Sequence, residues 1–166
     1  YHGVDPALSK AVAQAESSFR PDAVSSDGFA SKGIFQLLDS TAGDLITRFN
    51  FKEPYEPFDA AQNAYLGVGY LRRLHDIFST ETQLHSRLST IPVNSAEELE
   101  KVALAAFNAG EGNVATAQRQ AMLSGKDPSL YEAIAPYLPA STREYVSRVT
   151  QFRDQIAERE GGELIV

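Results

Sequence analysis

Glu16 is the residue of this 166-residue chain whose type and position best suit acid catalysis. It lies on the same helical stripe as the apolar residues Leu8 and Val12, so we expect its carboxyl on a buried face. Burial disfavours the charged form and raises the pKa of a carboxyl, and the C-terminal end of a helix acts in the same direction. Such a group can protonate a leaving oxygen, as the cleavage of glycosides requires. Taken alone, this one helix favours the simpler interpretation of a structural acid paired with Arg20 or Arg143.

Two short motifs elsewhere in the chain carry side-chain amides that could hold a sugar. "GIFQ", residues 33–36, ends in Gln36, and "AAFNAG", residues 105–110, contains Asn108. An amide both donates and accepts hydrogen bonds, which suits the hydroxyl and N-acetyl groups of a saccharide. Each residue also has a purely structural interpretation, Gln36 in a turn and Asn108 as a helix C-cap.

Helices must position these residues, because no run of five or more alternating residues predicts a strand. The Asp5-Pro6 pair predicts the start of the first helix, and a loop covers residues 20–33. Capping boxes at residues 95–98 and 141–144 predict two further helix starts. Residues 79–94 are interpreted as a loop or insertion. The remaining helices are expected at about 39–49, 60–78, 113–123 and 128–137. The predicted fold class is therefore all-α, with about seven helices.

Composition argues against several classes of function. The formal net charge is −7 and the pI about 4.9, and without a basic stripe we expect no nucleic-acid partner. The chain has no cysteine, and its three histidines lack metal-site spacing, so we expect no metal and no cofactor. No apolar run could span a bilayer. The first residues carry no signal-peptide pattern and suggest a domain cut from a longer chain.

Four motifs, taken in order, resemble the signatures of the soluble-type lytic transglycosylases: "ESSF", "GIFQ", "AAFNAG" and "STREYVSRV". "VDPALSKAVAQAES" resembles the family's opening helix and "FDAAQNAYLGVGYLRRL" its central one. The resemblance extends from about residue 4 to 149. It implies a goose-type lysozyme-like fold and one catalytic domain over residues 1–166.

The resemblance also implies an activity. Family members cleave the β-1,4 bond between N-acetylmuramic acid and N-acetylglucosamine in peptidoglycan glycan strands, and they leave 1,6-anhydromuramic ends. Glu16 corresponds to the catalytic acid, Ser17 would orient it, and Tyr145 would keep it aligned. The residues expected to contact the substrate are Ser17, Phe35, Gln36, Phe107, Asn108 and Tyr145. Phe35 would line a subsite where methionine is common, and the substrate implies a periplasmic or cell-envelope location.

The chain departs from the family pattern in several places. Phe107 stands where tyrosine is common, Glu111 replaces a frequent proline and Ser141 a frequent glutamate, and the loop over residues 25–33 is about two residues longer than usual. Two other functions stay open. A hydrolase on the same fold needs a second carboxylate, for which Asp27 and Glu111 are candidates, and a non-catalytic module would bind peptidoglycan without cleaving it.

Overall fold

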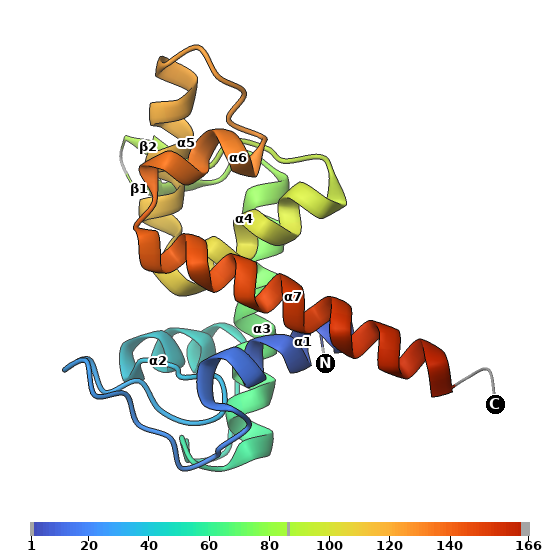
Figure 1. Cartoon of the computed structure of the whole chain (residues 1–166). Helices are drawn as coiled ribbons and strands as arrows, with labels where there is room; N and C mark the ends of the chain where they lie inside the picture. The colour runs from blue at the N-terminus through green and yellow to red at the C-terminus, as the bar shows by residue number, and fades with distance from the viewer. Residues whose placement is uncertain (1, 86, 164–166) are drawn as a thin grey trace. The chain divides into compact units, whose positions relative to one another are not determined.

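The computed structural model describes residues 2–85 and 87–163, which are mainly helical (Figure 1). In chain order the elements are α1 (Pro6–Ser17), α2 (Asp39–Arg48), α3 (Ala60–Ser79), β1 (Gln83–His85), β2 (Leu88–Ser89), α4 (Ala96–Ala109), α5 (Glu111–Leu123), α6 (Tyr131–Ile134), the 3₁₀ helix η1 (Ala135–Tyr137) and α7 (Ala140–Glu163). The described residues thus form seven α-helices, and the predicted all-α class is confirmed.

Backbone contacts divide the chain into two compact units. One holds the residues up to 70 together with those from 149 onward, and the other holds residues 71–148. The helices α3 and α7 contribute residues to both. Each unit has its own set of buried apolar side chains. The expectation of a single domain over residues 1–166 stays a prediction.

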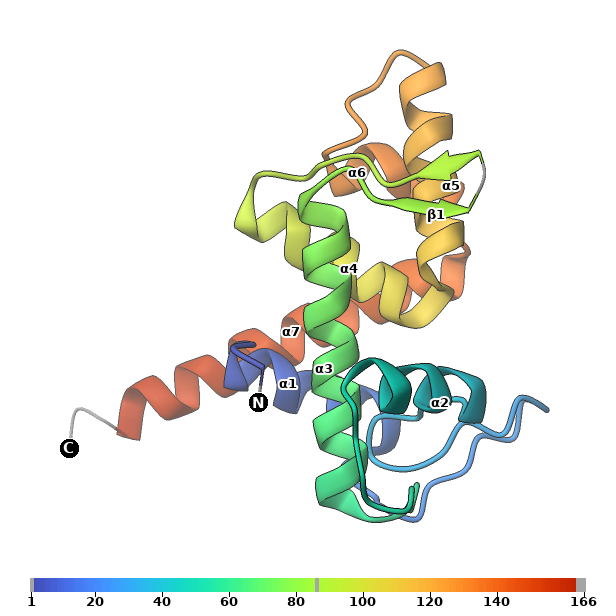
Figure 2. The same cartoon turned by 180° about the vertical axis from the view of Figure 1, so that it is seen from behind.

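In the first unit, α1 begins as the Asp5-Pro6 pair predicts. The Asp5 carboxylate accepts the Ala7 N–H at 3.0 Å and so satisfies a donor of the first turn. The helix ends at Ser17, and Ser18 adopts a left-handed backbone with φ of 53°. Figures 1 and 2 show α1 and α2 beside the first half of α3. The buried side chains of these helices include Leu8, Val12, Leu45 and Leu66.

In the second unit, α4 contributes an unbroken run of buried residues, 102–106. Ser95 caps this helix by accepting the Glu98 N–H at 3.4 Å, as predicted. The Glu98 carboxylate accepts the Tyr131 N–H at 2.6 Å and thereby ties α4 to the start of α6. Glu98 therefore serves a tertiary contact, which the capping motif alone did not predict.

Two predictions about element boundaries were wrong. Residues 79–94 contain a short antiparallel hairpin, β1 paired with β2, where a loop was expected. The last helix begins at Ala140, so Ser141 lies inside it and is not its N-cap. The physical reason is that the N–H groups of Thr142 and Arg143 both donate to the Pro139 carbonyl, at 3.0 and 3.1 Å.

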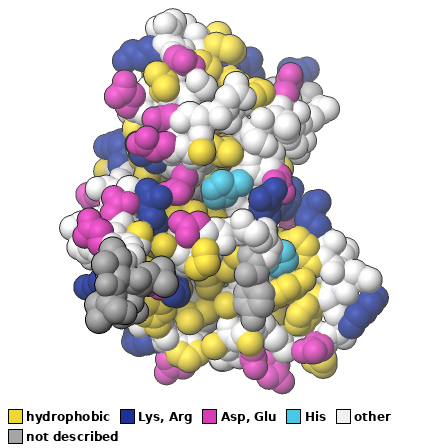
Figure 3. All heavy atoms as spheres, turned by 90° about the vertical axis from the view of Figure 1, so that its right-hand side faces the viewer, with side chains coloured by type: hydrophobic (Ala, Val, Ile, Leu, Met, Phe, Trp, Pro, Cys, Tyr) yellow, Lys and Arg dark blue, Asp and Glu magenta, His cyan; other side chains and the backbone are white. Residues whose placement is uncertain are grey.

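One face of the molecule, drawn in Figure 3, carries acidic and basic side chains interspersed with one another. Hydrophobic side chains gather in the lower part of that view. None of the helices in the described part of the chain combines the length and the apolar character needed to cross a membrane.

Candidate active site

Glu16 lies in the last turn of α1 and is partly buried. Leu8 and Val12, two turns and one turn earlier on the same stripe, are buried. Glu16 is therefore half-buried at the end of a stripe whose earlier members are buried, and the direction of its carboxyl stays a prediction. The chain leaves the helix directly after Ser17, so Glu16 stands at the point where α1 meets the following loop.

Ser17 joins the end of α1 to the segment that contains "GIFQ". Its buried hydroxyl lies 2.8 Å from the Ile34 carbonyl oxygen and 3.2 Å from the Ala13 carbonyl oxygen, one turn back in α1. Arg20 donates its Nε–H to the Ser17 carbonyl at 3.2 Å. Ser17 thereby fixes the last turn of α1, with Glu16 in it, against residues 33–36.

Asn63 of α3 holds the same segment through both ends of its amide. Its side chain is 0% exposed, its Nδ2–H donates to the Lys32 carbonyl at 3.0 Å, and its Oδ1 accepts the Phe35 N–H at 2.7 Å. Gly33 lies between these contacts with φ of +80°, and a Cβ there would come within 2.3 Å of the Pro57 carbonyl oxygen. Only glycine fits this close approach of backbone to α3 and its preceding loop.

Phe35 packs against Gly67, a glycine in the middle of α3. It is 3% exposed, and a Cβ added at Gly67 would lie 2.4 Å from its ring. The phenyl group therefore packs directly on the helix backbone and anchors this corner of the unit. Its expected place in a sugar subsite stays a prediction.

Gln36 adopts a left-handed backbone, with φ of 50°, at the end of the segment. Its amide nitrogen donates to the carbonyls of Ala23 and Gly33, at 3.0 and 2.9 Å. Because both amide protons are used in this way, Gln36 can offer a ligand only its Oε1, as an acceptor. Gln36 can therefore be both a turn residue and a ligand-binding residue, because its Nε2 serves the turn and its Oε1 would serve the ligand.

Asn108 lies in the last turn of α4 and is exposed. Its Oδ1 accepts the hydroxyl of Thr142, a buried residue of α7, at 2.8 Å. This contact leaves Nδ2 as the group that Asn108 can turn toward a ligand, as a donor. The C-cap of α4 is Gly110, so the interpretation of Asn108 as the cap is wrong.

Phe107 and Tyr145 belong to the same unit as Asn108. Phe107 is partly buried, and Tyr145 is buried with the Arg148 guanidinium 5.8 Å from its ring centroid. The expected site residues therefore fall into two groups. The first unit holds Glu16, Ser17, Phe35 and Gln36, and the second holds Phe107, Asn108 and Tyr145. Their roles toward a substrate stay predictions.

Both candidates for a second catalytic carboxylate have structural partners. Asp27 Oδ1 accepts the Phe29 N–H at 3.0 Å and the Ser25 hydroxyl at 2.8 Å, and these hydrogen bonds lower the pKa of Asp27. A carboxylate with a lowered pKa is a weak general base. Glu111 lies 3.4 Å from the Arg73 guanidinium. These contacts argue against the water-activating role that a hydrolase needs.

Two positioning residues were not selected from the sequence. Asn63 holds the "GIFQ" segment and Thr142 orients Asn108. The sequence held a signal for Asn63, which lies four residues before Gly67 on an otherwise apolar stripe of the helix. A polar side chain buried on such a stripe requires a hydrogen-bond partner. Thr142 stood inside the quoted motif "STREYVSRV". Within the described residues, no group of three or more His, Asp or Glu side chains is arranged to hold a metal.

The chain matches a known class of domain. Residues 1–129 match the family model described as "Transglycosylase SLT domain". Because the match covers most of the chain, the protein belongs to the SLT transglycosylase domain family.

Curated relatives carry a more particular name. The chain is 33% identical over 150 residues to the membrane-bound lytic murein transglycosylase F of Desulfosudis oleivorans, and 28% identical over 151 residues to the protein of that name from Marinobacter nauticus. Each match covers 90% of this chain, which spans 28% and 26% of the two relatives.

Solved structures show the same fold. The 70 kDa soluble lytic transglycosylase of Escherichia coli matches 95% of this chain with a TM-score of 0.67 and 21% identity. The lytic transglycosylase Slt of Pseudomonas aeruginosa, solved as an inactive glutamate-to-glutamine mutant, matches 96% with a TM-score of 0.71 and 22% identity. This chain covers 22% of each. The expected lysozyme-like fold is confirmed.

Proposed function

We propose that this chain is a catalytic domain that cleaves the β-1,4 bond between N-acetylmuramic acid and N-acetylglucosamine in peptidoglycan. The observation that carries the proposal is Glu16 at the end of α1, in a turn that Ser17 ties to the segment ending in Gln36. Family membership and the names of the curated relatives support it. The Pseudomonas aeruginosa relative lost activity through the kind of substitution that we propose for Glu16.

Bond cleavage begins with the Glu16 carboxylic acid. It donates its proton to the glycosidic oxygen as the bond from that oxygen to C1 of the muramic residue breaks, so that N-acetylglucosamine leaves as an alcohol. The cationic centre at C1 is stabilised by the substrate's own N-acetyl group, which takes the place of a second protein carboxylate. The engagement of Asp27 by its own loop agrees with this route.

Ring closure completes the reaction. The Glu16 carboxylate takes the proton of the C6 hydroxyl while O6 bonds to C1, which regenerates the acid and gives a 1,6-anhydro end. No water is consumed. In the first unit, Gln36 Oε1 would accept from a hydroxyl or amide N–H of a sugar. In the second unit, Asn108 Nδ2 would donate to a carbonyl or hydroxyl oxygen.

Mass spectrometry of muropeptides released from purified peptidoglycan tests this proposal. We expect products lighter by one water than hydrolysed ones, and we expect Glu16→Gln to fold normally and release less than about a tenth of them, because an amide cannot protonate the oxygen. Glu158→Gln, an exposed change on α7, is the matched control. Ordinary reducing ends would indicate a hydrolase, and binding without any release would indicate a non-catalytic module.

The place of action follows from the substrate. Peptidoglycan lies outside the cytoplasmic membrane, so the domain would act in the periplasm or cell envelope. The chain spans about a quarter of the length of its curated relatives. By analogy with them, this domain would be one part of a longer protein.

A further inference from the structure

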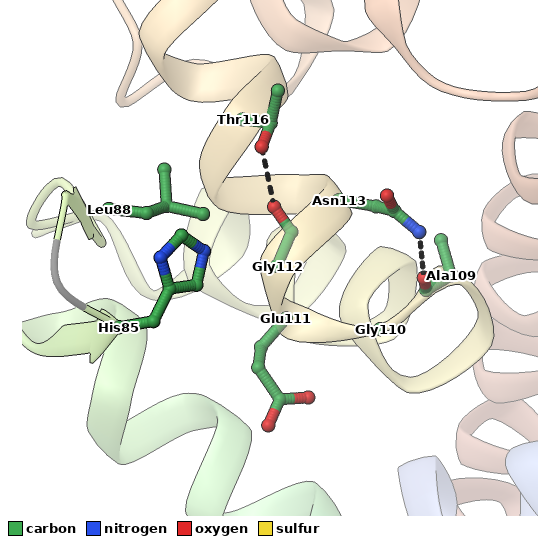
Figure 4. Close-up of a pocket in the computed structure, with 8 residues that line it drawn as sticks. All are labelled: His85, Leu88, Ala109, Gly110, Glu111, Gly112, Asn113 and Thr116. Carbon is green, nitrogen blue, oxygen red and sulfur yellow. Dashed lines mark hydrogen bonds between the residues drawn. The ribbon is translucent and has the colours of Figure 1, made fainter.

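The second unit contains a pocket beside the hairpin that the sequence did not predict. It has a volume of about 380 Å³ and lies between the β1–β2 hairpin and the start of α5 (Figure 4). Pockets that hold small ligands span about 300–1,000 Å³. Its walls come from His85 and Leu88 of the hairpin and from residues 109–113 with Thr116. We call it the hairpin pocket.

The hairpin is fixed at its base by Thr90, which is buried. The Thr90 hydroxyl oxygen lies 2.7 Å from the Ile77 carbonyl oxygen and 2.8 Å from that of Thr80, and it accepts the Thr82 N–H at 2.9 Å. One side chain thus ties the two arms of the insertion to each other and to the end of α3.

Gln118 of α5, which is fully buried, holds the insertion from a second element. Its Oε1 accepts the Ile91 N–H at 2.9 Å, and its Nε2 donates to the carbonyls of Ile91 and Pro128 at 2.9 and 3.3 Å. The Val93 N–H donates to the Phe78 carbonyl at 2.9 Å. These hydrogen bonds hold the base of the insertion, on either side of the paired strands that line the pocket.

The lining combines apolar side chains with hydrogen-bonding side chains. The His85 ring and Leu88 face the start of α5, as Figure 4 shows. Asn113 donates its amide to the Ala109 carbonyl at 2.7 Å, and Thr116 donates its hydroxyl to the Gly112 carbonyl at 2.9 Å. These bonds use the Thr116 hydroxyl proton and one of the two Asn113 amide protons. The two side-chain oxygens remain as acceptors and Asn113 keeps one N–H donor, which suits the hydroxyl and N-acetyl groups of an amino sugar.

Charge favours a neutral occupant. Among the described residues that line the pocket, Glu111 is the carboxylate, and the Arg73 guanidinium lies 3.4 Å from it; neither lysine nor arginine is part of that lining. The carboxylates of the peptide stems of peptidoglycan would therefore find no cation of the lining to pair with. N-acetylglucosamine residues of the glycan are uncharged.

From these features we propose that the hairpin pocket is an additional subsite that binds an N-acetylglucosamine residue of the glycan strand. The inference rests on the proposed function, because Ala109, which lines the pocket, directly follows the expected sugar-binding residue Asn108. His85 and Asn113 would determine how strongly longer strands bind.

Calorimetric binding of β-1,4-linked N-acetylglucosamine oligosaccharides of increasing length tests the subsite. The Glu16→Gln variant serves as background so that nothing is cleaved. We expect His85→Ala and Asn113→Ala each to weaken the binding of oligosaccharides long enough to reach the pocket by about tenfold and to leave shorter ones unchanged. The amide NMR signals of Gly110 and Gly112 should shift with the longer oligosaccharides only.

Matched controls lie on the same two elements outside the pocket lining. Gln83→Ala on the hairpin and Gln120→Ala on α5 change exposed residues and should leave binding unaltered at every length. If His85→Ala and Asn113→Ala behave like these controls, the pocket is no sugar subsite. In a second titration with peptide-bearing glycan strands, weakening confined to those strands would show that the peptide is the occupant and that the sugar assignment is wrong.

The wild-type product analysis keeps this test separate from the proposed function. Anhydro products combined with unchanged length dependence in the two variants would refute the subsite and leave the function standing. Absent products combined with the length-dependent loss would refute the transglycosylase and leave a sugar-binding pocket.

Discussion

Replacing Gly67 by alanine should displace Phe35 and the segment that carries Gln36. The new Cβ would lie 2.4 Å from Phe35 Cγ and 2.6 Å from its Cβ, whereas ordinary contacts begin near 3.4 Å. The ring must therefore retreat by about 1 Å from a position where it is 3% exposed. Because Asn63 holds the Phe35 N–H at 2.7 Å, the backbone resists that movement.

Two effects of opposite sign determine the change in stability. Alanine in a helix interior is more favourable than glycine by about 1 kcal/mol, and overpacking a buried site costs about 1–3 kcal/mol. Gly43→Ala in α2 provides the matched control, because nothing lies within 4 Å of a Cβ there. The control should gain about 1 kcal/mol. The difference between the two variants, about 1–3 kcal/mol, then measures the Phe35 clash alone.

Urea unfolding of both variants, together with product release from peptidoglycan, provides the assay. We expect Gly67→Ala to unfold at lower urea than Gly43→Ala and to lose activity that the control keeps. Adding Phe35→Met should restore both properties in part, because methionine is unbranched and adapts to altered space. Equal stability of the two glycine variants, or failure of the methionine to restore any of the loss, would refute the packing of Phe35 on α3 as the support of this segment.

Three further predictions concern the second unit. Thr142→Val removes the hydroxyl that donates to Asn108 Oδ1, so turnover of peptidoglycan should fall severalfold while the unfolding free energy changes by no more than about 1 kcal/mol. Unchanged turnover would contradict the role of Thr142 in orienting Asn108. Gln118→Leu leaves the backbone groups of Ile91 without their partners and should lower the unfolding free energy by about 2–4 kcal/mol in urea titrations; a loss below about 0.5 kcal/mol would be the contrary result. Burial lowers the pKa of His75 below 6.5, so the unfolded chain binds a proton more readily and the unfolding free energy should decline as the pH falls below about 6.5. His75→Gln should show a smaller decline in urea midpoint between about pH 7 and pH 5 than the wild type, and parallel declines would contradict the prediction.

Features that depend on neighbouring residues were predictable from the sequence. Asp5 and Ser95 cap their helices as expected, because a cap needs only the residues of the first turn. The partial burial of Glu16 followed from its spacing to Leu8 and Val12. The Ser141 cap failed because the Pro139 carbonyl supplies the acceptor for the first turn of α7.

Features that depend on distant residues were not predictable in the same way. The strands of the hairpin have three and two residues, too few for a pattern, and they are held by Thr90 and Gln118. The amide of Asn63 finds its partners about 30 positions earlier in the chain, at Lys32 and Phe35. The hydrogen-bonding groups that Gln36 and Asn108 keep for a ligand depend in the same way on distant partners, Ala23 for Gln36 and Thr142 for Asn108. The sequence indicated the two residues, and the structure shows which of their atoms are already used.

The attachment of the hairpin at its base has a consequence for how this domain can diversify. Thr90 and Gln118 lie outside the paired strands, so residues 83–85 can be exchanged while these anchors and the buried Leu88 stay the same. Surface loops on a constant scaffold accept such changes readily. A library confined to these positions would vary one wall of the hairpin pocket on a constant base, which makes this insertion a natural place to engineer a new ligand preference without loss of stability.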